Sequence, residues 1–273
     1  MATREVTAHK ETTIPAPKVP KGQGRELSAL TEHIVREISQ MFRREVLESM
    51  SKGAVATFAD AAPVNFGAEY ARQVRVVQRR LSKRLGDAKI RGLIDKILRK
   101  ADGNARRALY AQVEKAVGLS TKELTATEGL SAIIDSYIAE TTQWVIKLRD
   151  DTLSEYTANT LRAMSLGQSL EDVMKQYKGL EEKRKNHAKF TARNQIANFN
   201  SLTTKVRAQN LGITEAIWRT ARDETVRDSH KDRNGKRFDL GKGLYSALDG
   251  KWLLPGVDFQ CRCDYELIIP GAG

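Results

Sequence analysis

Apolar residues recur at steps of three and four along most of the chain between residues 25 and 211. The first such series contains Leu27, Ile34 and Met41, and a second runs from Tyr70 to Leu85. This period is typical of an α-helix that buries one face and leaves polar residues on the other. The same pattern predicts further helices over 88–100, 104–118, 128–150, 151–165 and 188–211. Ser169, followed by Asp172, resembles a capping box and predicts one more helix start.

Beyond Gly212, which suits the left-handed C-terminal cap of a helix, the period changes. The segment EAIWRTARD alternates as a strand does, and residues 221–260 are rich in Gly, Asp and Asn. The closing stretch alternates as well, and its apolar face comprises Cys261, Cys263, Tyr265, Leu267 and Ile269. The predicted fold class is therefore α+β and predominantly α-helical. A long helical N-terminal part is followed by a small C-terminal unit with short strands and long loops.

Three domains follow from these shifts in pattern. Residues 1–24 carry three prolines and two glycines with few large apolar side chains, which predicts a flexible tail. We expect a helical domain over 25–187 and a separate C-terminal domain over 188–273. Trp218 and Trp252 are expected to anchor the core of the C-terminal domain.

No stretch approaches the roughly 20 apolar residues of a membrane span, so we expect no membrane partner. The N-terminal stretch also lacks the apolar segment of a secretory signal. With only two cysteines, the chain is expected to stay reduced in the cytoplasm in which it is made.

The charge balance adds an expectation about partners. The chain has 46 Lys and Arg residues against 34 Asp and Glu, a net charge of +12, which favours polyanionic partners. A basic helix face gathers part of this excess: Arg72, Arg75, Arg79, Arg80, Lys83 and Arg84. We expect this face to contact double-stranded DNA without sequence preference. The alternatives are a solvated helix face and a face docked on an acidic protein surface.

Both cysteines, Cys261 and Cys263, lie two residues apart near the end of the sequence. In a strand their Cα atoms would be about 6.5–7 Å apart, near the upper limit for a disulfide, so a bridge is not expected. Both thiols would face the same side, where they can bind one ion. We therefore predict a zinc site of Cys261, Cys263 and His230, with a fourth ligand from Asp223, Asp228 or Asp258. The alternative is that both cysteines are buried as small apolar groups and His230 only hydrogen-bonds a turn.

The order of motifs in this region carries a family resemblance. Roughly residues 188–266 resemble the Mu F-like phage head morphogenesis proteins. The stretches that carry this resemblance are, in order, ARNQIANFNSLTTKVRAQNLGI, WRTARDETVRDSHKDRNGKRF and PGVDFQCRC. The matching positions include Trp218, Arg227, Gly235 and Pro255, alongside Asp223, Val226, His230 and the Cys-Arg-Cys triplet. Arg227 is also expected to pair with a neighbouring carboxylate and fix its loop.

The resemblance implies a minor head protein of a tailed double-stranded-DNA bacteriophage. Such a protein would associate with the portal or the major capsid protein in the head interior, after assembly in the host cytoplasm. It would take part in head assembly or in genome packaging and ejection.

Two other functions remain open from the residues alone. The first is a metal-dependent nuclease or hydrolase with His230 as general base and Asp228 or Asp232 at the metal. The segment holds a single histidine and no further His–Asn cluster follows, so no enzyme is expected. The second is a cellular nucleic-acid-binding adaptor, which would leave the C-terminal motifs unexplained.

Overall fold

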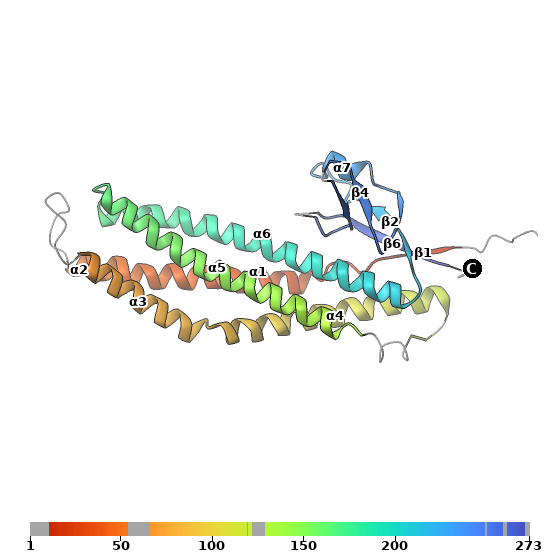
Figure 1. Ribbon diagram of the computed structural model, residues 1–273, viewed down its shortest axis with the longest axis horizontal. Coiled ribbons are helices and arrows are strands. Elements are labelled where there is room, and N and C mark those ends of the chain that lie inside the picture. The colour runs from red at the N-terminus through yellow and green to blue at the C-terminus, as the bar shows by residue number, and fades with distance from the viewer. Residues whose placement is uncertain are drawn as a thin grey trace, which may run out of the picture. The chain divides into compact units, whose positions relative to one another are not determined.

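The computed structural model describes residues 11–53, 66–118, 120–121, 129–248, 250–258 and 261–270 (Figure 1). Its contacts divide the chain into two units. The sheet unit is drawn from residues 1–24, 97–137 and 193–273, and the helical unit from 25–96 and 138–192. The protein is mostly helical, with a small set of short antiparallel strands, so the predicted α+β fold class is confirmed.

Long helices make up most of the described chain. Their bounds are α1 (Lys21–Phe42), α3 (Phe66–Arg84), α4 (Asp87–Val117), α5 (Ser131–Ser165) and α6 (Leu170–Asn210). A π-helical turn, η1 (Arg43–Glu48), and the short α2 (Ser49–Gly53) follow α1. As predicted, the Ser169 hydroxyl caps the start of α6 by accepting the Asp172 backbone N–H at 3.2 Å.

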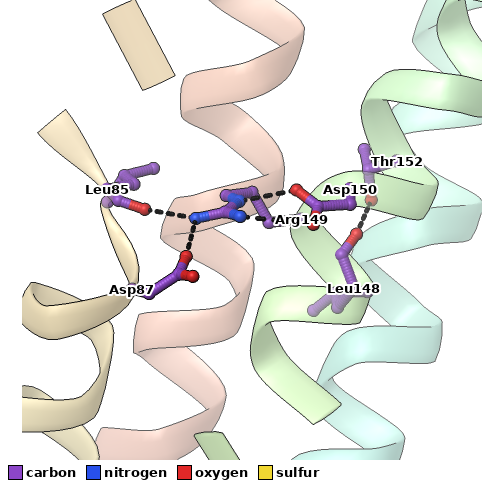
Figure 2. Close-up of polar contacts among 6 residues, drawn as sticks. All are labelled: Leu85, Asp87, Leu148, Arg149, Asp150 and Thr152. Atoms are coloured by element: carbon purple, nitrogen blue, oxygen red, sulfur yellow. Dashed lines mark hydrogen bonds and ion pairs between the residues drawn. The ribbon is translucent and has the colours of Figure 1, made fainter. Parts of the chain in front are cut away.

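Three of the expected interruptions between helices are absent. α4, α5 and α6 each run without a break through positions where shorter helices were predicted to end. Gly103 and Gly179 lie inside α4 and α6, because one glycine costs a helix only about 1 kcal/mol relative to alanine. α5 continues through the break predicted after residue 150, and there the Thr152 hydroxyl donates to the Leu148 carbonyl at 2.6 Å (Figure 2).

Aromatic side chains fill part of the helical unit. Phe42 stacks on Tyr177 with ring centroids 5.4 Å apart, and both rings contact Tyr156. The hydroxyl of Tyr177 donates to the Tyr156 carbonyl at 2.5 Å. These contacts join α1, α5 and α6, which the apolar periodicity alone could not pair.

The Arg149 side chain of α5 holds the junction between α3 and α4 (Figure 2). It donates from Nη1 to the Leu85 carbonyl at 2.9 Å and to Asp87 Oδ1 at 2.8 Å. Its Nε donates to the neighbouring Asp150 at 2.8 Å. A single guanidinium thus satisfies a carbonyl beyond the end of α3 and pairs with the first residue of α4.

Four strands form the main sheet in the order β1-β6-β2-β3, with every pair antiparallel. They are β1 (Thr12–Pro15), β6 (Asp264–Ile269), β2 (Glu215–Arg219) and β3 (Arg237–Asp239), and Figure 1 shows β1, β6 and β2 together. A separate pair consists of β4 (Leu244–Ser246) and β5 (Lys251–Leu253). The helix α7 (Asp228–Lys231) lies in the long connection between β2 and β3.

The prediction of a flexible tail over 1–24 is wrong for its described part. Thr12–Pro15 forms β1 in register with β6, and α1 already begins at Lys21. Three consecutive β-branched residues, Thr12, Thr13 and Ile14, favour a strand, and Pro15 is tolerated because β1 is an edge strand. Ile14 is buried in the core of the sheet unit. Residues 1–10 lie outside the described ranges.

Side chains from two helices complete the core of the sheet unit. Leu109 and Val113 of α4 and Ala208 of α6 belong to the same buried cluster as Trp218 and Tyr265. Residues 97–137 therefore belong with the C-terminal segment, and the predicted boundary between 187 and 188 does not separate the two units. The sequence could not show this, because both halves of α4 have the same helical period.

A buried ion pair fixes α4 to α6 inside this unit. Arg207, which is 1% exposed, donates from Nη2 to Asp102 Oδ1 at 2.6 Å. Removing one member of such a pair leaves the other charge buried without compensation.

The two tryptophans expected in the core differ in the structure. Trp218 is fully buried, as predicted, whereas Trp252 is 57% exposed. Trp252 lies opposite Tyr245 in the β4–β5 pair, with ring centroids 5.5 Å apart, and Tyr245 is also exposed. The prediction for Trp252 is wrong because the two-stranded sheet buries only one face, and this pair lies on the other.

Across the described ranges, no helix is both long enough and apolar enough to cross a bilayer.

Arg149→Met should weaken the helical unit. The change removes the bonds to Leu85 and Asp87, and we expect a loss of about 1–3 kcal/mol in the free energy of unfolding, measured by urea titration. Lys147→Met is the matched control, since Lys147 makes an exposed pair with Asp151 on the same helix and should change stability by at most about 0.5 kcal/mol. Equal effects of the two variants would contradict the role given to Arg149.

Candidate metal centre

The sheet brings two distant loops to one end. β2 and β6 are antiparallel, and Arg219 at the end of β2 is in register with Asp264 at the start of β6. The chain that leaves β2 and the chain that enters β6 must therefore meet at the same sheet end. The first carries α7 and His230, and the second carries Cys261 and Cys263.

His230 lies inside the sheet unit. It is 3% exposed, and its ring stands edge-on to Trp218 with centroids 5.8 Å apart. α7 places it one turn after Arg227, whose carbonyl accepts the His230 N–H at 2.9 Å.

Both thiols lie against the same ring nitrogen. His230 Nδ1 is 3.5 Å from Cys261 Sγ and 3.6 Å from Cys263 Sγ, and the three atoms lie within 4.8 Å of one another. Tetrahedral zinc with bonds of about 2.3 Å to sulfur and 2.0–2.1 Å to nitrogen would hold such a nitrogen and sulfur about 3.5 Å apart. Both distances from the nitrogen to a sulfur therefore match those around one zinc ion.

The surroundings favour negative charge on one of the two sulfurs, that of Cys261. The hydrogen bond with Cys263 is the largest influence on Cys261; burial opposes it, but His230 and the Gly256 N–H help it to lower the Cys261 pKa to about 4. The same hydrogen bond, with burial, raises the pKa of Cys263. The two sulfurs are hydrogen-bonded to each other, and binding of a cation by both would require the loss of the proton between them. Gly256, which donates to Cys261 Sγ at 3.4 Å, has a φ of +80° that favours glycine.

A carboxylate lies on the opposite side of the imidazole. His230 Nε2 is 3.4 Å from Asp258 Oδ2, close enough for charge interaction although not aligned as a hydrogen bond. Asp258 in turn accepts from Arg227 Nη1 at 2.5 Å, so the expected pairing of Arg227 with a carboxylate is confirmed. This arrangement resembles the outer carboxylates that orient metal-binding histidines.

The structure does not bring Asp223 to the centre. Asp223 Oδ1 accepts from Arg262 Nη2 at 2.5 Å and from the Thr225 hydroxyl at 2.8 Å, and it is outside the His–Cys–Cys group. Asp228 points to solvent, with a side chain 95% exposed that pairs with Lys231. Asp258 faces Nε2 rather than the sulfurs. The prediction of Asp223 as fourth ligand is thus wrong, because the adjacent arginine competes for its carboxylate.

The other motif positions shape this end of the sheet. Gly235, with φ +81°, donates its N–H to the Trp218 carbonyl at 2.8 Å and turns the chain back into β3. The carbonyl of Pro255 accepts from the Ser201 hydroxyl of α6 at 2.8 Å. Sequence analysis did not assign roles to Gly256 and Arg262, although both lie within the PGVDFQCRC stretch.

The predicted basic face lies on α3, in the helical unit. Three of its six cations are paired with acids: Arg72 with Glu69 at 2.7 Å, Arg80 with Glu45, and Arg84 with Glu37 at 2.9 Å. The other three, Arg75, Arg79 and Lys83, are exposed and make no ion pair with any residue that the structure describes. They follow each other at four-residue steps and form one row along the helix.

The fold and the centre define a mostly helical α+β protein with a buried His–Cys–Cys group at one end of a small sheet. Residues 155–266 match the family described as "Phage Mu protein F like protein", which confirms the resemblance indicated by the motifs. This match suggests a structural protein of phage head morphogenesis.

A curated relative gives a second comparison. It is an uncharacterized protein of Haemophilus influenzae, 22% identical over 230 residues, which is 84% of this chain and 50% of the relative. The chain thus spans about half the length of that relative. No solved structure matches the chain.

Proposed function

We propose that this protein is a minor head protein of a tailed double-stranded-DNA phage, acting in head assembly or in genome packaging and ejection. The family match over residues 155–266 carries this proposal. The proposed location is the head interior, beside the portal or the major capsid protein, after assembly in the host cytoplasm.

The surroundings of His230 disfavour the alternative of a metal-dependent nuclease. A general base must reach the proton it removes, but Nδ1 faces two thiols and the residue is 3% exposed. Asp228 is held by Lys231 at 2.8 Å and points to solvent. These positions suit a centre that stabilises loops better than one that performs hydrolysis.

Association of the chain with phage heads tests the main proposal. The exposed pair Tyr245 and Trp252 is a candidate contact surface, since tyrosine and tryptophan are enriched at the centres of protein interfaces. We expect the chain to co-sediment with portal-bearing heads and to remain after their DNA is digested. Tyr245→Ala with Trp252→Ala should lower its amount in heads several-fold. Leu166→Ala, at an exposed apolar residue of the helical unit, is the control. Absence of the wild-type chain from heads would refute the proposal.

For the metal, the proposal is that Cys261, Cys263 and His230 hold a zinc ion that ties the loops of the sheet unit together. Bound zinc would neutralise two buried thiolates and join the two loops described above. Because Asp258 lies at the outer ring nitrogen, Asp258→Asn should weaken zinc binding by about 10- to 100-fold.

Metal analysis and chelator competition measure this effect. We expect about one zinc per wild-type chain, loss of most of it in His230→Ala, and no change in His187→Gln, which alters an exposed histidine of α6. Wild-type protein without stoichiometric zinc, whose melting temperature ignores chelators, would exclude the site.

For DNA, we propose that the row Arg75, Arg79 and Lys83 contacts the phosphate backbone. Replacing all three by Gln should weaken binding to duplex DNA and flatten the dependence of log K on log salt by about 2–3, because each phosphate contact contributes about 0.9. Anisotropy titrations over a range of salt concentrations measure both quantities.

The matched control replaces Arg72, Arg80 and Arg84 by Gln, which removes the same net charge from ion-paired positions. This variant should flatten the slope less than the first. Equal slopes for both variants, or no binding by the wild type at low salt, would contradict the assignment to one row.

A further inference from the structure

The His–Cys–Cys group is open on one side. A pocket of about 160 Å³ reaches His230, Cys261 and Cys263, and its remaining lining includes Thr225, Arg227 and Arg262. A tetrahedral ion bound by three side chains has one further position, and this pocket offers space beside the three donors.

The described residues supply no fourth ligand. The group of possible metal donors found among them contains only the histidine and the two cysteines. Asp223, Asp228 and Asp258 are held by Arg262, Lys231 and Arg227, respectively. Four protein ligands are usual for structural zinc, whereas three are usual in catalytic zinc sites, where water or a substrate takes the fourth position.

Arg262 is paired with Asp223 but offers further hydrogen-bond donors to the pocket. Its Nη2 donates to Asp223 and Thr225, while its Nε and Nη1 make no hydrogen bond within the described ranges. Two thiolates and a divalent ion sum to zero charge, so an entering anion meets no net repulsion from the centre. The planar guanidinium beside the opening matches a carboxylate in shape and charge.

We propose that the centre is an open metal site whose fourth position binds a carboxylate from outside the described chain, with Arg262 as a second contact to that carboxylate. This inference rests on the metal proposal above. It would let an acidic side chain of a partner protein bind directly to the ion.

Cobalt(II) in place of zinc makes the coordination visible by absorption. We expect thiolate-bound cobalt in the full chain, and saturable changes of its visible bands on titration with azide and with acetate. Arg262→Gln should weaken acetate binding roughly tenfold, as loss of a charged hydrogen bond predicts. Arg219→Gln is the control, since Arg219 pairs with Glu266 and does not line the pocket.

The outcomes separate the two proposals. Absence of thiolate-bound cobalt would refute the metal site itself. Cobalt bands that ignore both anions would show a filled fourth position and overturn this inference while the metal site stands. A response to azide without one to acetate would overturn the carboxylate class, and equal weakening by Arg219→Gln would overturn the role of Arg262.

Discussion

The pairing of β6 with β1 on one side and β2 on the other is the constraint on which the sheet unit depends. β6 lies between two strands that are remote from it in sequence, and its buried Tyr265 and Leu267 contribute to the core. The register of β6 against β2 also places the Cys-Arg-Cys triplet beside the loop of His230. A shift of one residue would exchange the two faces of β6 and move both thiols away from the imidazole.

Much of the fold, and the grouping of His230 with Cys261 and Cys263, followed from local sequence signals. Helical periodicity located the helices, and two-residue alternation predicted both cysteines to point inward from a strand. Both are buried, but they precede β6, which begins at Asp264. The strand at Thr12–Pro15 was missed, because its stability comes from a partner some 250 residues away. Asp223 was assigned wrongly for a similar reason: its competitor, Arg262, is distant in sequence. Sequence spacing shows which residues share a face of a strand or helix, but not which charged residue from elsewhere in the chain pairs with them.

Ion pairing divides the positive charge of the chain into two classes. Two of the six cations of the basic face on α3 hold neighbouring segments, since Arg80 and Arg84 pair with acids of η1 and α1. Net charge alone therefore overstates how many cations are available to an anionic partner. The half-buried guanidinium of Arg149 has a similar role in joining segments. Arginine thus joins segments of the protein where it is ion-paired, whereas the unpaired arginines of α3 are available to attract an anionic partner.

The edge position of β1 has a consequence for biosynthesis. Because Thr12 is in register with Ile269, the chain must be synthesised as far as Ile269 before this ladder can close. During elongation the segment that forms β1 has mainly helical segments near it, and its backbone amide groups lack the partner strand with which they later pair. We therefore expect the helical unit to fold first and the sheet unit to be completed only once β6 has been synthesised, as is common for topologies with distant contacts.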